Sequence, residues 1–182
     1  MLGHDTPSRP TEPLPGGLGL GTIDQLTAAL AGGVTTVGNM TFIRPGELPL
    51  AALERERALA IAQAISDVFL HPVFGETTPE VLAQIPQLLE NGCNTIKYFM
   101  SMPRFDPQVE GYLAATRLAG ENQLLTMIHC EDFPILTEAT QRLVNAGKLS
   151  LKHYPESRPV LSEVVALIDG AFVIQGDGTV LS

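Results

Sequence analysis

Residues 91–102, NGCNTIKYFMSM, contain a single lysine within a short run of apolar and β-branched residues. The run from Cys93 to Met100 has the length and composition of a buried strand, and Gly92 precedes it as a turn residue. Lys97 is the exception, because an unpaired ammonium group buried away from water loses its charge or finds a partner. Either the Lys97 head group reaches water from the end of the strand, or the lysine has a specific role.

Helices and strands alternate on both sides of this run. Short apolar runs predict four strands, at about residues 34–40, 67–74, 94–99 and 124–129. Amphipathic segments predict helices at residues 22–33, 47–66, 78–91, 107–121 and 132–147. Pro86 predicts a kink or a break in the third of these helices. The alternation predicts an α/β fold with a parallel sheet.

The composition is that of a globular protein with an acidic surface. Of the 182 residues, 45% are hydrophobic and 17% are charged, and the net charge is −9. An acidic chain without a basic patch is not expected to bind nucleic acid or an anionic membrane. No apolar run reaches the roughly 18 residues that a membrane span needs.

The two cysteines and the start of the chain predict a cytoplasmic protein. Cys93 and Cys130 lie in apolar runs and form no CxxC pair, so we expect reduced thiols and no zinc finger. The proline-rich start has no apolar segment of the kind found in signal peptides. A flavodoxin-like binding module is an alternative for such a chain, but the phosphate-binding loop that it needs is not found.

Lys97 and His129 stand near the C-terminal ends of neighbouring predicted strands. In parallel α/β barrels, the side chains at these ends meet the substrate. His129, in the segment LLTMIHCED, is either a satisfied structural histidine or a metal ligand. Glu131 and Asp132 follow at once and are expected to open the next helix, where acidic side chains favour the positive end of the helix dipole.

Three segments resemble the amidohydrolase superfamily, and within it the dihydropyrimidinase, hydantoinase, allantoinase and dihydroorotase group. They are NTIKYFMS, LLTMIHCED and HYPESRPVLSE, with 32 residues from Lys97 to His129. AALAGGVTTVGNM also resembles the segment after the first barrel strand of these enzymes. The resemblance covers about residues 22–167. It implies a partial (β/α)8 TIM barrel, about half of one, because a complete barrel needs roughly 250 residues.

The resemblance implies a metal-dependent hydrolase that acts on C–N bonds in cyclic amides or ureides. Lys97 matches the lysine that the family carboxylates and uses to bridge two divalent metals, usually zinc. His129 matches a ligand of the second metal. Such a pair of metals lowers the pKa of water and polarises the amide carbonyl. A carbamate held by two cations would also account for a lysine in a buried strand.

The sequence departs from the family pattern in its other ligands. The family's HxH pair, its later histidine and its proton-transferring aspartate have no counterpart, so no catalytic residue is assigned. His4, His71 and His153 do not match ligand positions, and His71 is expected to face a loop or the barrel mouth. The count of strands implies that one is missing before residue 1. We therefore expect a truncated chain that lacks several metal ligands.

Met102 and Arg104 are the candidate substrate-binding residues. Met102 stands five residues after Lys97, where hydantoinase-like enzymes have a tyrosine. Tyr98 cannot replace that tyrosine, because it is expected on the opposite face of the strand. Arg104 lies in a predicted loop over the barrel mouth, where it either meets an acidic substrate group or is solvated.

The sequence predicts three successive segments of the chain and leaves two alternatives for its function. Residues 1–21 are expected to form an irregular arm, residues 22–167 the partial barrel, and residues 168–182 a β-hairpin around Gly176 and Gly178. A half barrel leaves two open sheet edges, so a homo-oligomer is expected. The alternative to a hydrolase is a non-catalytic interaction protein of the collapsin-response-mediator type, or an inactive fragment.

Overall fold

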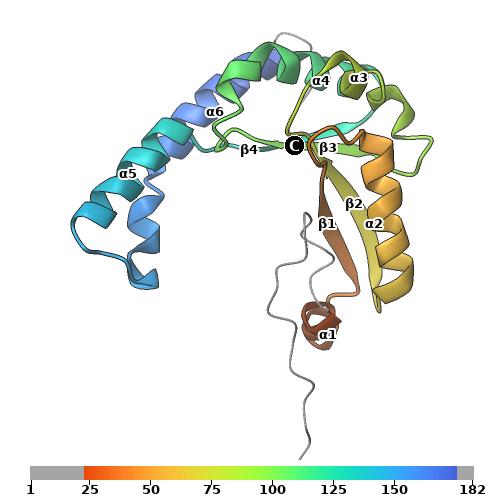
Figure 1. The fold of residues 1–182 in the computed structure, drawn as a ribbon, viewed down its shortest axis with the longest axis horizontal. Coiled ribbons are helices and arrows are strands. Elements are labelled where there is room, and N and C mark those ends of the chain that lie inside the picture. Colours follow the sequence, from red (N-terminus) through yellow and green to blue (C-terminus); the bar gives the residue numbers. More distant parts are fainter. Residues whose placement is uncertain (1–22, 176–182) are drawn as a thin grey trace, which may run out of the picture.

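A computed structural model describes residues 23–175, in which helices and strands alternate along the chain (Figure 1). The strands are β1 (Thr36–Phe42), β2 (Asp67–Val73), β3 (Thr95–Phe99) and β4 (Leu125–His129). The α-helices within this range are α1 (Ile23–Ala31), α2 (Pro49–Gln63), α3 (Pro79–Leu82), α4 (Val109–Glu121), α5 (Phe133–Asn145) and α6 (Val160–Gln175). Short 3₁₀ helices are η1 (Ile85–Gln87), η2 (Asp106–Gln108) and η3 (Leu151–Ser157). The predicted arm at 1–21 lies outside the described residues.

The four strands form one parallel sheet in the order β1-β2-β3-β4. The α/β fold predicted from the sequence is therefore confirmed. Val73 pairs with Lys97, and Lys97 pairs with Met127, so the carboxyl ends of the strands lie along one edge. In the described part of the chain the sheet does not close on itself, as it would in a complete barrel of eight strands.

Helices cover one face of the sheet and form the core with it. Ile96 and Tyr98 point to this face and are 0% and 1% exposed. The Tyr98 hydroxyl lies 2.9 Å from Thr116 Oγ1 on α4, and the Tyr98 ring packs against Tyr112. Figure 1 shows α3 and α4 over β3, and α2 along β1 and β2. The alternation of side chains along β3 leaves Lys97 on the opposite face, as predicted.

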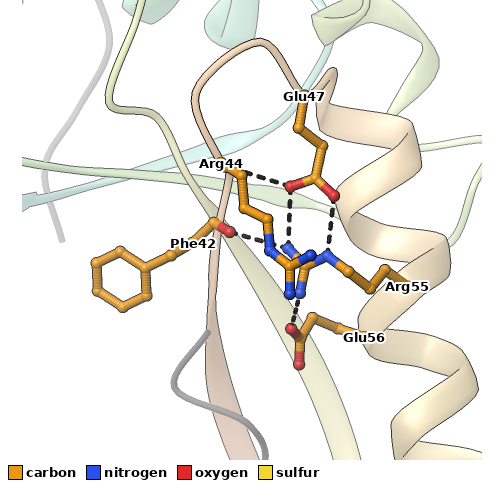
Figure 2. Close-up of polar contacts among 5 residues, drawn as sticks. All are labelled: Phe42, Arg44, Glu47, Arg55 and Glu56. Carbon is orange, nitrogen blue, oxygen red and sulfur yellow. Dashed lines mark hydrogen bonds and ion pairs between the residues drawn. The ribbon is translucent and has the colours of Figure 1, made fainter. Parts of the chain in front are cut away.

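Arg55 fastens the loop after β1 to helix α2 (Figure 2). Its guanidinium donates to both carboxylate oxygens of Glu47, at 2.8 and 3.0 Å, and to the Phe42 carbonyl oxygen at 3.0 Å. It also contacts Glu56, which is buried. The backbone N–H of Arg44 donates to Glu47 at 2.9 Å. This bidentate arrangement fixes the carboxyl end of β1, next to the candidate site.

The helix predicted at residues 78–91 is broken into two short pieces. Helix α3 begins after Thr78, whose hydroxyl caps it, and ends at Leu82. The next turn, η1, is a 3₁₀ helix that contains Pro86. A proline inside a helix removes a backbone hydrogen bond and clashes with the preceding turn, which accounts for the break.

The β-hairpin predicted at residues 168–182 is wrong in its first arm. Helix α6 begins at Val160 and continues to Gln175, so the apolar run before Gly176 is helical. A short apolar run is compatible with a strand or with a helix, and here the run extends a helix that has already begun. Residues 176–182 lie outside the described part of the chain.

The second face of the sheet combines polar and exposed apolar side chains. Phe69 and Leu125 on this face are 48% and 51% exposed. Lys97 and His71 lie between them in the sheet and are each only 7% exposed. None of the helices in residues 23–175 is both long and apolar enough to cross a membrane.

Candidate functional site

Lys97 and His129 both lie against the ring of Phe99 at the carboxyl edge of the sheet. Phe99 pairs with His129 across β3 and β4, and their ring centroids are 5.3 Å apart. The Lys97 ammonium nitrogen lies 4.6 Å from the Phe99 ring centroid. The structure thus brings together the two residues that the sequence proposed as metal ligands, on one aromatic side chain.

Lys97 is buried and has no hydrogen bond or ion pair with another described residue. Burial lowers its pKa, because the charged ammonium form is poorly solvated there. The Phe99 ring offers only a weak cation–π contact, which does not replace the lost hydration. The environment of Lys97 therefore favours the neutral amine over the ammonium.

His129 is the last residue of β4 and has a buried carboxylate as its partner. Its Nε2 atom contacts Glu131 Oε2, and Glu131 is 8% exposed. Arg158, just after η3, lies 3.9 Å from the other Glu131 oxygen. The Glu131 carboxylate thus contacts both His129 and Arg158. The residue that caps α5 is Asp132, whose side chain accepts a hydrogen bond from the Ile135 N–H at 2.8 Å.

His71 lies in β2, on the same face of the sheet as Lys97, and it faces β3 rather than the loop that was one of the two predicted alternatives. Its Nδ1 atom is 2.8 Å from Thr95 Oγ1 on β3. Burial lowers the His71 pKa, and the nearby charge of Lys97 lowers it further. The alternation of side chains along β2 puts His71 on the same face as Val73, and Val73 pairs with Lys97, so His71 and Lys97 share a face. The sequence alone does not reveal this register between β2 and β3.

Gly38 makes room for His71. A Cβ atom at this position would lie 2.8 Å from His71 Nε2 and 3.0 Å from the Phe69 ring. A larger residue at position 38 would require the His71 or Phe69 ring to shift. Glycine at this position therefore leaves the space that the His71 imidazole occupies.

Met102 and Arg104 line a pocket of about 120 Å³ beside this group. Phe42, Val73 and Phe99 form its floor at the ends of β1, β2 and β3. The Arg104 guanidinium lies over Gly75, where a Cβ atom would be 2.5 Å from its Nη1 atom. The pocket is thus mainly apolar and has one cationic side chain at its rim.

The remaining histidines, the cysteines and the acidic residues are the other side chains that could bind a metal. Within residues 23–175, no group of three or more His, Cys, Asp and Glu side chains is placed to hold a metal ion. His153 lies on η3 and contacts Glu156 at 2.5 Å, so it belongs to a surface pair. His4 lies outside the described residues. Cys93 and Cys130 are free thiols, as predicted. An unpaired buried lysine and a carboxylate-bound histidine fit a metal site, as part of a larger set of ligands.

Comparison with known proteins finds hydantoinases and an allantoinase as relatives of this chain. No protein-family model matches the chain. An allantoinase of Solibacter usitatus is 31% identical over 160 residues, which are 83% of this chain and 34% of that protein. A D-hydantoinase of Geobacillus stearothermophilus is 28% identical over 134 residues, which are 72% of this chain and 28% of that protein.

Solved structures give the same result. A D-hydantoinase structure is similar with a TM-score of 0.73 and 26% identity, over 90% of this chain and 35% of that one. D-hydantoinase from Bacillus sp. AR9 gives a TM-score of 0.77 at 21% identity, over 87% and 35% of the two chains. The chain spans about a third of the length of the relatives that it matches. The predicted resemblance is thereby confirmed: the neighbours of this chain in sequence and in structure are hydantoinases, dihydropyrimidinases and allantoinases of the amidohydrolase superfamily, each matched over part of its barrel.

Proposed function

We propose that this chain contributes Lys97 and His129 to the metal centre of a hydrolase that cleaves C–N bonds in cyclic amides or ureides. The observation that carries the proposal is that both side chains lie against Phe99, with Lys97 buried and unpaired among the described residues. The metal would be zinc or another divalent cation, and a carboxylated Lys97 together with His129 would hold it as part of a binuclear centre. The relatives named above are enzymes of this type, which supports the reading.

Each side chain has a definite task in this proposal. A pair of divalent cations, when bound, supplies a polarised amide carbonyl and a lower pKa for water. Lys97 would hold the cations as a carbamate, whose negative charge they would neutralise, and burial disfavours the free ammonium that competes with it. Phe42 and Phe99 stack at the carboxyl edge and give the pocket an apolar wall. His71 and Thr95 keep the neighbouring inner face polar without adding a charge.

The pocket that Phe99 lines together with Met102 and Arg104 is the proposed place of the substrate, and Lys97 contacts the same Phe99 ring. Met102 supplies apolar contact where the related enzymes hold a tyrosine, so ring recognition differs from theirs. Arg104 is among the lining residues of the pocket and could pair there with an anionic group on the substrate. The hydrogen bonds of Gln108 to the Gly75 and Arg104 carbonyl oxygens, at 3.3 and 3.2 Å, hold the two rim loops together.

The described residues do not complete the centre by themselves. Lys97 and His129 form two parts of a ligand set that requires further donors. The sheet of the described residues has open edges at β1 and β4, and an edge of this kind pairs readily with another strand. We propose that the functional protein is a homo-oligomer in which added strands complete the sheet.

The second candidate is a non-catalytic interaction protein with the same fold. The observation in its favour is that residues 23–175 contain no group of three or more metal-binding side chains. The two candidates differ in what they require of Lys97. A hydrolase needs its amine for the metal centre, whereas an interaction protein keeps it only as a remnant.

Hydrolysis of hydantoin and dihydrouracil by the full chain, supplied with zinc and bicarbonate, tests the proposal. We expect ring opening that depends on zinc and is lost in Lys97→Ala. Lys148→Ala is the matched control, because Lys148 is exposed and pairs with Glu156 on the surface. Activity that survives in Lys97→Ala, or that is absent in a folded, zinc-loaded chain, would contradict the hydrolase and favour the interaction protein.

A further inference from the structure

We propose that the pocket lined by Phe99 and Met102 selects cyclic ureides that carry a carboxylate on a ring substituent, with Arg104 as the specificity-determining residue and Gln108 as the residue that positions it. The pocket is mainly apolar, and of the described residues that line it Arg104 alone is charged. The ureide ring of this ligand rests on the proposed function, whereas the selection of an anionic group does not.

The Arg104 guanidinium is not used by the fold. It forms no hydrogen bond or ion pair with another residue of the described part of the chain. Glu47 and Glu76 line a small neighbouring cavity with it, but Arg55 holds the Glu47 carboxylate, and no ion pair joins Glu76 to Arg104. A planar guanidinium binds a carboxylate through two parallel hydrogen bonds, and an apolar surrounding strengthens such a pair.

Gly75, two residues after the end of β2, leaves the space in which this guanidinium lies. A Cβ atom at position 75 would be 2.5 Å from Arg104 Nη1, so the guanidinium packs directly on the backbone of the loop. The atom that such a Cβ would meet is the end of a flexible side chain. Gly75→Ala should therefore displace the guanidinium without unfolding the chain.

Gln108 links the loop that carries Arg104 to the loop after β2. Its Nε2 atom donates to the carbonyl oxygens of Gly75 and Arg104, at 3.3 and 3.2 Å. Its Oε1 atom accepts from the backbone N–H and the hydroxyl of Thr77, at 3.1 and 3.3 Å. Both ends of one side-chain amide thus hold the backbones of Gly75 and Arg104 together. A cation held in this way loses less conformational freedom when an anion binds.

Helix α4 fixes the same loop from the other side. A Cβ atom on Gly111 would lie 1.9 Å from Thr77 Oγ1, so the helix backbone approaches the loop as closely as only glycine allows. The Tyr112 hydroxyl donates to the Phe74 carbonyl oxygen at 3.3 Å. The loop after β2 is therefore a fixed support for the Arg104 guanidinium.

A matched pair of probes tests the selection on the full metal-free chain, by NMR titration. They are hydantoin with a carboxymethyl group at C5 and the corresponding primary amide, which have nearly the same size and differ in charge. We expect the acid to bind about tenfold more tightly, as for other hydrogen bonds to charged groups. The net charge of −9 disfavours anions elsewhere on the chain, so this preference reports a local cation.

Four variants separate the roles of the residues. Arg104→Gln should give equal affinities for the acid and the amide, without weakening the amide. Gln108→Met, which keeps the length of the side chain and loses its hydrogen bonds, should lower the preference for the acid, as should Gly75→Ala. A merely structural role of Gln108 would weaken both probes equally. Arg142→Gln is the matched control, because Arg142 is exposed on α5, and it should keep the preference.

Equal affinities in the unmodified chain, binding of neither probe, or a preference that survives in Arg104→Gln would overturn the proposal. A preference that is lost in Arg104→Gln and unchanged in Gln108→Met would overturn the positioning role of Gln108. A zinc-loaded chain that prefers the acid but opens neither ring would contradict the proposed hydrolase and leave the selection of an anionic group supported.

Discussion

The two faces of the sheet differ in what their side chains do, and β3 shows this within five residues. Ile96 and Tyr98 face the helices, are almost completely buried and have partners for their polar atoms. Lys97 and Phe99 face the other way, where the lysine is buried without an ion pair among the described residues. A strand that only needed stability would have an apolar residue in place of Lys97. The comparison teaches that one face consists of packed side chains that stabilise the fold, whereas the other holds a group whose burial is costly, which we propose is kept for function.

The helix-covered face is expected to dominate stability. Tyr98→Ala should lower the free energy of unfolding by about 3–5 kcal/mol, because it removes a large buried ring and leaves a cavity next to Tyr112. Urea unfolding followed by circular dichroism measures this loss. A loss below about 1 kcal/mol would show that the helix-covered face does not dominate the stability of the fold.

Alkaline pH should weaken the same face through the ionisation of Tyr98. Burial raises the pKa of Tyr98 to about 12, above the value of about 10 for an exposed tyrosine. Between these values the unfolded chain releases a proton that the folded chain keeps, so stability is full below pH 10 and falls as the pH rises to 12. The loss is at most roughly 3 kcal/mol.

Urea midpoints measured from pH 9 to pH 12 follow this loss. Tyr98→Phe has no phenol at this position, so its curve should fall less steeply over the same range. Burial also raises the pKa of Tyr112, Cys93 and Cys130, and these groups contribute to the part that remains. Equal slopes in the two proteins would contradict the assignment to Tyr98.

The opposite face should gain stability when its lysine is removed. Lys97→Met is expected to raise the free energy of unfolding of the metal-free chain by roughly 1 kcal/mol, because it replaces a buried and unpaired ammonium with an apolar side chain of similar length. The gain should shrink as the pH rises, since burial lowers the Lys97 pKa and the folded chain loses this proton first. Lys148→Met, at an exposed position, should change little. A strong destabilisation in Lys97→Met would mean that Lys97 stabilises the fold.

The smallest effect is expected at an exposed apolar residue of that face. Leu125 is 51% exposed at the start of β4, an edge strand of the described sheet. Leu125→Thr should change the free energy of unfolding by no more than about 0.5 kcal/mol. If the face is covered in a homo-oligomer, the same change should shift the sedimentation profile towards smaller species. An unchanged profile would exclude Leu125 from the contact between copies.

Local patterns were enough to predict the sheet and its two polar strand ends. The four strands lie within two residues of their predicted bounds, because short apolar runs between amphipathic helices leave few alternatives. Lys97 and His129 were found because a charged or polar side chain interrupts such a run. The predicted opposite directions of Lys97 and Tyr98 follow from the two-residue repeat of a strand, and the structure has them so.

Features that depend on pairing between distant segments could not be predicted in this way. The place of His71 beside Thr95 requires the register between β2 and β3, and the Arg158–Glu131 contact requires the packing of η3 and α6. The run before Gly176 was misjudged because its composition suits both a strand and a helix, and the helix begun at Val160 decides between them. The roles of Met102 and Arg104 remain predictions, although the structure places both at one pocket.

Zinc content per chain, measured by elemental analysis on the full chain prepared with zinc and bicarbonate, tests the central claim most directly. The account predicts about one or two tightly held zinc ions per chain, lost in Lys97→Ala and reduced in His129→Ala. Lys148→Ala should retain the metal. A folded chain that holds no zinc, or that holds as much in Lys97→Ala as in the unmodified protein, would contradict the claim that Lys97 and His129 form part of a metal centre.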